Sequence, residues 1–237
     1  MKLPAGWRLE YRESVGSTND VAKTFDTGNV VVRADEQTAG RGRFNRVWQS
    51  PAGNLYCSFA FTPDLNEGLT RYSFAVAVAL HETVQSFKPD ADVVCKWPND
   101  ILIAGKKVSG ILLELTGIPE KPRLIAGIGV NIVSFPQDAS LLYRATSLSE
   151  QNIAADADAV LEKLADRIGF WTRQPADAVV RAFADRVYGI GKPITVSLPV
   201  GKIDGVFKAI DDDGALLLDT GDGTVRRIMA GDVFYQG

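Results

Sequence analysis

The sequence changes character at Gly189-Ile190-Gly191. Before this point, strand-like segments are mixed with helical stretches; after it, only short strand-like segments occur, at residues 193–198, 202–210, 215–219 and 224–229. Asp-Gly and Gly-Asp-Gly sequences, which favour tight turns, separate the last of these segments. The pattern predicts two domains: an α+β domain over residues 1–188 and a small β-barrel over residues 189–237.

The first domain has the pattern of a mixed β-sheet with flanking helices. Trp7, Leu9 and Tyr11 alternate with charged residues, which is the period-two pattern of a half-buried strand. Further strands are predicted at residues 29–35, 54–62, 93–97, 101–103, 108–116 and 123–132, and helices at 70–87, 156–171 and 175–188, with Pro175 suited to a first helical position. Residues 36–53 are polar and glycine-bearing, so they predict a long loop of the kind that is often functional.

Charge and hydropathy exclude some function classes. With 26 basic and 29 acidic residues the formal net charge is −3, which disfavours a general nucleic-acid binder because counterion release on DNA needs a cationic surface. The chain lacks an apolar run of about 18 residues, and residues 1–6 are too short and polar for a signal peptide. We therefore expect a cytoplasmic protein without a membrane span.

A cluster of cations in residues 40–48 is the most informative local feature. These nine residues hold no acid and three arginines, at positions 41, 43 and 46. Guanidinium groups bind phosphate or carboxylate in a fork, and Gly40 and Gly42 would let the backbone adopt positive φ and approach an anion. The cluster indicates a negatively charged ligand, although a solvated loop that merely carries charge is the alternative when the loop is taken alone.

Two further polar clusters lie near predicted strand ends. One is Lys96-Trp97-Pro98-Asn99-Asp100, and the other is Lys106-Lys107-Val108-Ser109-Gly110 on the next hairpin. They bring an amide, a carboxylate and ammonium groups together at rigid positions, which suits groups aimed at a reacting atom. Ordinary turn chemistry is the alternative.

Five ordered motifs together resemble the bacterial biotin protein ligases. The motifs are Ser17-Thr18-Asn19, residues 37–43 with Trp48, residues 96–100, residues 107–112 and residues 127–131. The resemblance covers residues 7–150 and, more loosely, the C-terminal segment. It implies the biotin/lipoate ligase fold, which is similar to class II aminoacyl-tRNA synthetases, followed by an SH3-like barrel.

The resemblance also implies a reaction. Biotin and ATP would form biotinyl-5′-AMP and pyrophosphate, with Mg²⁺ accompanying the triphosphate and no residue of this chain assigned as a metal ligand. The biotinyl group would then pass to a lysine of a biotin carboxyl carrier protein, a subunit of acetyl-CoA carboxylase, or of another biotin-accepting domain. The implied catalytic residues are Arg43, Lys107 and Asp100; Asp100 would position or deprotonate the carrier lysine, and turn capping is its alternative role.

The residues of the two ligand sites follow from the same resemblance. For biotin they are Ser17, Thr18, Asn19, Gln37, Gly40, Arg41, Gly42, Arg43, Lys107 and Gly110. For ATP and the adenylate they are Arg43, Arg46, Trp48, Asn99, Lys107 and Asn131. Trp48 would stack on adenine and Asn131 would recognise its edge, while helix capping is a second role open to Ser17 and Thr18. Loop 40–48 is expected to be mobile when empty and to order over the adenylate.

One departure and two rival functions complete the analysis. Only about six residues precede the first predicted strand, so the resemblance is to the monofunctional form without an N-terminal DNA-binding domain. A homodimer is left open. The rivals are a nucleic-acid-binding module and an acyl ligase for lipoate or octanoate; Gln37 with Ser17 and Thr18 favours a ureido ligand over a plain alkyl chain.

Overall fold

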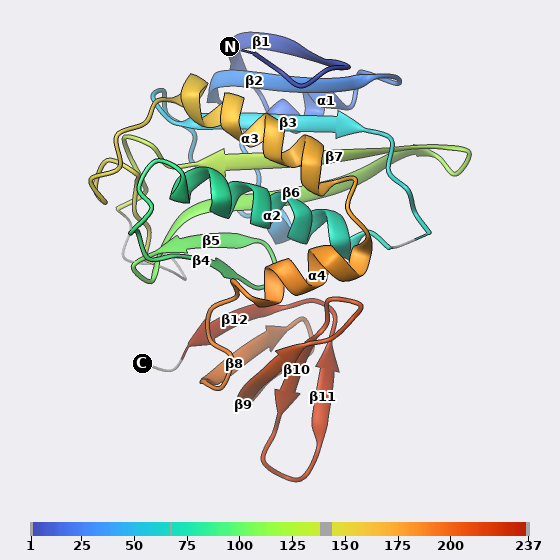
Figure 1. Ribbon diagram of the computed structural model, residues 1–237, viewed down its shortest axis with the longest axis vertical. Helices are drawn as coiled ribbons and strands as arrows, with labels where there is room; N and C mark the ends of the chain where they lie inside the picture. Colours follow the sequence, from blue (N-terminus) through green and yellow to red (C-terminus); the bar gives the residue numbers. More distant parts are fainter. Residues whose placement is uncertain (1, 67, 138–143, 236–237) are drawn as a thin grey trace.

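A mixed seven-stranded sheet forms the larger part of the protein (Figure 1). The computed structural model describes residues 2–66, 68–137 and 144–235. The strand order is β1-β2-β3-β7-β6-β5-β4, with β1 parallel to β2 and the other neighbours antiparallel, as a mixed sheet requires. The strands are β1 (Trp7–Val15), β2 (Asn29–Gln37), β3 (Leu55–Phe61), β4 (Val93–Lys96), β5 (Asp100–Ile103), β6 (Lys106–Ile118) and β7 (Lys121–Val130).

Strand alternation separates a core face from a second face of this sheet. Leu55, Cys57 and Phe59 of β3 pack in the main core, under the longer helices seen in front of the sheet in Figure 1. Ala60 packs on the opposite face with Ala22 of the short helix α1. The helices are α1 (Thr18–Ala22), α2 (Thr70–Gln85), α3 (Ala157–Trp171) and α4 (Ala176–Ala184). The face that carries α1 is therefore the one on which a ligand can reach the sheet.

Two details of the last helix differ from the prediction. Pro175 is the N-cap of α4 and not its first helical residue. The helix ends at Ala184, and the following segment runs beside β4, where the Cys95 amide donates to the Arg186 carbonyl at 2.8 Å and the Tyr188 amide donates to the Cys95 carbonyl at 2.8 Å. Satisfying the edge of the sheet outweighs another turn of helix.

The C-terminal segment forms a five-stranded antiparallel sheet in the order β11-β10-β9-β8-β12. Its strands are β8 (Pro193–Leu198), β9 (Gly201–Ile210), β10 (Leu216–Asp219), β11 (Val225–Ile228) and β12 (Asp232–Tyr235). The prediction missed β12, which has four residues and reaches its partner β8 only through tertiary pairing.

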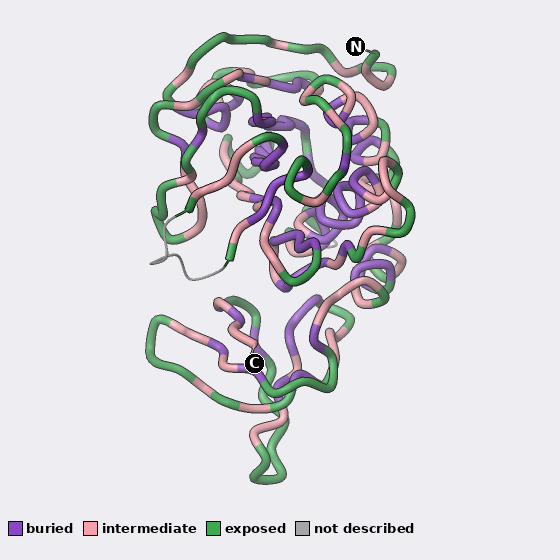
Figure 2. The backbone as a smooth tube through the Cα atoms, turned by 90° about the vertical axis from the view of Figure 1, so that its left-hand side faces the viewer, coloured by how far each residue is buried: buried purple, intermediate pink, exposed green. Residues whose placement is uncertain are grey.

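The two sheets share one continuous core. Ile194 and Phe207 of the C-terminal sheet belong to the same buried cluster as Phe74 and Phe183 of the helices. The indole Nε1 of Trp97 donates to the Gly214 carbonyl across the junction at 3.0 Å. Figure 2 shows buried stretches in both parts of the chain, whereas the turn between β10 and β11, at the lower end of the view, is exposed. The packing holds the C-terminal sheet in a defined position beside the seven-stranded sheet.

Candidate active site

A cavity of about 460 Å³ opens on the α1 side of the seven-stranded sheet. Strands β6 and β7 form part of its wall, loop 40–48 covers it, and Asp232 reaches it from the C-terminal sheet. Most of the residues predicted from the sequence line it: Thr18, Gln37, Arg41, Gly42, Arg43, Arg46, Trp48, Asn99, Asp100, Lys107, Gly110 and Asn131. Ser17, Asn19 and Gly40 are not among the lining residues.

Hydrogen bonds between side chains hold the wall near α1. The backbone amide and the hydroxyl of Thr18 both donate to Gln37 Oε1, at 2.9 Å and 3.1 Å. Gln37 Nε2 donates to Ser50 Oγ at 2.9 Å, and Ser58 Oγ lies 2.8 Å from Thr18 Oγ1. An amide nitrogen has two N–H groups, so Gln37 can hold Ser50 and still offer a donor to a polar ligand.

Ser17 and Asn19 lie behind this wall. Ser17 is the N-cap of α1, but its side chain makes no capping hydrogen bond within the described chain, so the capping role expected as an alternative is not seen. Asn19 Nδ2 donates to Glu114 Oε2 at 2.6 Å, and its side chain covers Gly127, where a Cβ would come within 2.2 Å of Asn19 Oδ1. Gly127 thus makes room for Asn19.

The arginine loop closes on itself without the positive φ angles predicted for its glycines. Gly42 has φ −108°, and the residues with positive φ are Phe44 at 54° and Asn45 at 57°. Gly40 is required for a different reason, because a Cβ there would lie 2.4 Å from the carbonyl oxygen of Trp48. The Trp48 amide donates to the Gly40 carbonyl at 2.9 Å and so closes the base of the loop.

Each arginine of the loop contacts an acceptor at the rim of the cavity. Arg41 binds both carboxylate oxygens of Asp20, at 2.7 Å and 2.5 Å, and this contact lowers the pKa of Asp20 and raises that of Arg41. Arg43 Nη1 donates to Asn99 Oδ1 at 3.2 Å. Arg46 pairs with Asp232. The cations predicted to meet an anion therefore do converge on one cavity.

The Trp48 side chain packs against strands β6 and β7. A Cβ at Gly129 would come within 2.4 Å of its ring, and one at Gly110 within 3.2 Å. Lys107 Nζ lies 5.5 Å from the ring centroid. The indole Nε1 is buried and has no hydrogen-bond partner among the described residues, a deficit that costs about 1–3 kcal/mol. Gly110 and Gly129 thus make room for this indole.

The two asparagines use their amide nitrogens to join backbone segments. Asn131 Nδ2 donates to the Thr146 carbonyl at 3.0 Å, and Asn99 Nδ2 donates to the Ile111 carbonyl at 2.6 Å. Asn99 Oδ1 accepts from Arg43. Both side chains are thereby held in fixed orientations at the cavity wall.

Two charged residues in or near this site were not among the predicted catalytic and binding residues. Lys96 ends β4 and is only 2% exposed; burial is the main reason that its pKa falls to about 7, and the charge of Lys107 adds to the effect. Its place in the motif of residues 96–100 was the available signal. Asp232 offered no local signal, because its partner Arg46 is 186 residues away in the chain.

Comparisons with known proteins show the family to which the chain belongs. Residues 12–131 match the model of the Biotin/lipoate A/B protein ligase family, and residues 189–235 match the Biotin protein ligase C terminal domain. The chain is 35% identical over 222 residues to a biotin–[acetyl-CoA-carboxylase] ligase of Paracoccus denitrificans, covering 89% of this chain and 92% of the relative. It is 33% identical to the Mycobacterium tuberculosis protein of that name, covering 98% of this chain and 90% of the relative.

A solved structure extends the similarity to the fold. The biotin protein ligase of Aquifex aeolicus in complex with biotin and ATP superposes with a TM-score of 0.84 at 29% identity, over 96% of this chain and 98% of that one. Fold, cavity and family match together define a protein ligase of the biotin and lipoate class. Within that class, the chain belongs to the biotin protein ligases.

Proposed function

We propose that the cavity binds biotin and ATP side by side and joins them as biotinyl-5′-AMP, releasing pyrophosphate. The overall activity is that of a biotin–[acetyl-CoA-carboxylase] ligase, EC 6.3.4.15. The observation that carries the proposed route is the convergence of Arg41, Arg43, Arg46 and Lys107 on one cavity in a chain of net charge −3. Two unit anions about 4 Å apart repel by roughly 4 kcal/mol at an effective dielectric near 20, and these cations offset that repulsion.

In the first step, a carboxylate oxygen of biotin attacks the α-phosphorus of ATP and pyrophosphate leaves. Arg43 and Lys107 bind the carboxylate and the α-phosphate and so stabilise the charge that develops between them. Lys107 exchanges its contact with Asp100 for one with the substrate. Arg41, Gly42 and the backbone at Gly40 and Gly110 close around the ligand.

The ureido ring of biotin needs polar partners when it is buried. We assign this role to Thr18 and Gln37, whose hydrogen-bonded wall supports the assignment. Ser17 and Asn19 then act from behind Thr18 and keep the wall in place.

The nucleotide occupies the part of the cavity beneath the arginine loop. Trp48 stacks on adenine, Asn131 recognises the adenine edge, and Arg46 and Asn99 help to hold the phosphates. The unpartnered Nε1 of Trp48 supports a rearrangement of this indole on binding.

Mg²⁺ enters with the triphosphate in this proposal. Asp100 and Asp232 are the carboxylates that line the cavity, and within residues 2–66, 68–137 and 144–235 no group of three metal-ligating side chains occurs. Such a donor set fits Mg²⁺, which keeps several waters and is held largely by substrate phosphates. The ion supplies neutralisation of phosphate charge, and no residue is assigned as its ligand.

In the second step, the amine of the carrier lysine attacks the acyl carbon of the mixed anhydride and AMP leaves. The lysine must first lose a proton, since its ordinary pKa near 10.4 keeps it charged at neutral pH. Asp100 is proposed to position this amine and accept the proton, which its location on the cavity wall supports. The acceptor is the biotin carrier of acetyl-CoA carboxylase or a similar biotin-accepting domain.

Other expectations stay proposals. We propose a catalytic domain at residues 1–188 and a C-terminal domain at 189–237, supported by the start of β8 at Pro193 and the family match at 189–235. A cytoplasmic location and the absence of nucleic-acid binding stay predictions of the sequence, and the oligomeric state stays open. Among the described helices, none has the length and apolarity that a bilayer crossing needs.

Mass spectrometry after incubation with biotin, ATP and Mg²⁺ tests the proposed route. We expect biotinyl-adenylate bound to the purified protein, and its loss in Lys107→Ala and Arg43→Ala. Lys106→Ala is the matched control, since Lys106 pairs with Glu150 at 3.4 Å and does not line the cavity. Pyrophosphate release with lipoate but not with biotin, or ATP-independent and salt-sensitive DNA binding without adenylate, would support a rival function.

A further inference from the structure

Asp232 brings a carboxylate from the C-terminal sheet into the wall of the cavity. It is the first residue of β12, and its side chain is only 14% exposed. The carboxylate pairs with both terminal nitrogens of the Arg46 guanidinium. A two-point contact of this kind fixes the orientation of a guanidinium as well as its position.

A second contact joins the same turn to the arginine loop. The carbonyl of Gly231 accepts from Arg43 Nη1 at 3.3 Å. Residues 231 and 232 therefore hold two of the three arginines in the loop, although they lie 188 and 186 residues away from them in the chain.

The turn itself is held in place by packing. Asp232 pairs with Ser197 in the antiparallel register of β12 and β8. A Cβ at Gly231 would lie 2.9 Å from the Val196 side chain, so the backbone sits directly on β8. The acceptor for Arg46 is thus part of a sheet and not of a free loop, and a site on a regular element is positioned more accurately than one on a loop.

Arg46 explains how a carboxylate can serve a site that binds a triphosphate. A carboxylate that faced the triphosphate directly would repel it, whereas a guanidinium has five donors and can hold a carboxylate on one side and a phosphate on the other. Lys96 also interacts electrostatically with Asp232, but with a pKa of about 7 it carries only about half of a unit charge at neutral pH, whereas Arg46 stays fully charged.

We infer that Asp232 is a positioning residue for ATP, which acts by holding the Arg46 guanidinium against the triphosphate. The inference rests on the proposed function and extends it, because it makes the nucleotide site depend on a residue of the C-terminal sheet. Asp232 itself does not touch the reacting atoms.

The test compares Asp232→Asn with the wild type by calorimetric titration of ATP and Mg²⁺ and by the KM for each substrate. We expect the Kd and the KM for ATP to rise about tenfold, as for the loss of one charge-assisted hydrogen bond, while the KM for biotin changes less than about twofold. Asp232→Glu should recover most of the lost affinity. Unchanged or tighter ATP binding in Asp232→Asn would overturn the inference, the latter because it would make Asp232 a competitor of the phosphates.

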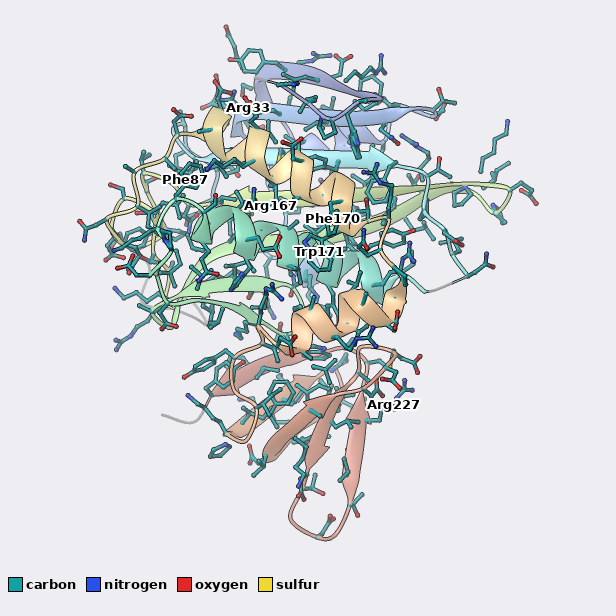
Figure 3. The ribbon with its side chains drawn as sticks, viewed as in Figure 1. Arg33, Phe87, Arg167, Phe170, Trp171 and Arg227 are labelled. Carbon is teal, nitrogen blue, oxygen red and sulfur yellow. The ribbon has the colours of Figure 1, made fainter. Side chains whose placement is uncertain are left out.

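Asp213→Asn is the matched control. Asp213 pairs with Arg227, which Figure 3 labels on the C-terminal sheet, and neither residue lines the cavity. Asp213→Asn should leave the KM values for ATP and biotin unchanged. A rise in the KM for ATP equal to that in Asp232→Asn would show that loss of any carboxylate from this sheet disturbs the site, and it would overturn the inference.

A double-mutant cycle with Arg46→Gln separates a role through Arg46 from an independent one. In the Arg46→Gln background, Asp232→Asn should change the KM for ATP less than about twofold, because the guanidinium that it holds is gone. Fully additive effects would overturn the inference. Biotin-dependent pyrophosphate release by the wild type tests the proposed function separately. Failure of the proposed function would appear in that assay, whereas failure of the inference about Asp232 would appear in the Kd and KM values of the variants.

Discussion

Lys107 and Asp100 form an ion pair inside the cavity, with Lys107 Nζ 2.6 Å from Asp100 Oδ1. The two residues come from neighbouring antiparallel strands, β6 and β5, and both line the cavity. The Lys107 ammonium thus has two partners. It holds the Asp100 carboxylate, which is proposed to act in transfer to the carrier, and it is itself proposed to bind the substrate during adenylate formation. Arrival of an anionic ligand would draw Lys107 away and expose Asp100 to the carrier lysine.

Substitutions of Lys107 and Asp100 should slow different steps of the reaction. We expect Lys107→Ala to slow adenylate formation by about 100-fold, since it removes a cation that stabilises the transition state. Asp100→Asn should slow transfer to the carrier more than it slows adenylate formation. Single-turnover assays that follow pyrophosphate and biotinylated carrier separately measure both steps, and an equal loss in both steps for Asp100→Asn would contradict its assignment.

Gly129→Ala should weaken ATP binding through Trp48. The new Cβ would lie 2.4 Å from the indole, a distance that forces the ring to move. We expect a rise in the KM for ATP of about tenfold and a changed tryptophan emission spectrum. Gly110→Ala is the milder partner, because its Cβ would lie 3.2 Å from the ring and needs only a small adjustment. A larger effect at Gly110 than at Gly129 would argue against this reason.

Ligands should protect loop 40–48 from trypsin. The loop offers cleavage after Arg41, Arg43 and Arg46, whose side chains are at the cavity wall. We expect biotin with ATP to slow this cleavage about tenfold if the loop closes over the adenylate. Cleavage after Arg227, on the C-terminal sheet, serves as the internal control. Equal rates with and without ligands would exclude ordering of the loop.

Burial of Lys96 predicts a pH dependence of stability. The native pKa of about 7 lies below the ordinary lysine value of 10.5, so between these pH values the unfolded chain binds a proton that the native chain does not. The free energy of unfolding should therefore rise with pH across this window, by on the order of 1 kcal/mol per pH unit from this group.

Lys96→Met tests that dependence. In urea unfolding between pH 7.5 and 9 (about the middle of the window), the variant should lose most of the rise seen in the wild type. Lys208→Met, at a β9 lysine whose side chain is 53% exposed, should keep it. Parallel curves for the wild type and Lys96→Met would show that Lys96 is charged in the native protein at these pH values.

Local pattern sufficed for most of the regular structure, whereas the composition of the cavity was implied by the resemblance to the biotin protein ligases. The periodicity of residues 70–87 predicted α2 to within a few residues, and Asp-Gly turns marked the C-terminal strands. The motif residues Gln37, Lys107 and Asn131 do line one cavity, although their roles stay predictions. Short-range signals succeed here because side-chain periodicity and turn chemistry are properties of neighbouring residues.

By itself, then, the sequence determined the mixed sheet with its flanking helices, the strand-rich C-terminal segment and the residues that supply positive charge. Only the tertiary structure decided that Asp232 meets Arg46, that Trp48 rests on Gly129, and that Lys96 is buried. These facts depend on segments up to 186 residues apart that meet through packing of one shared core. That packing determines which residues are buried and which distant residues pair, and local sequence patterns do not predict it.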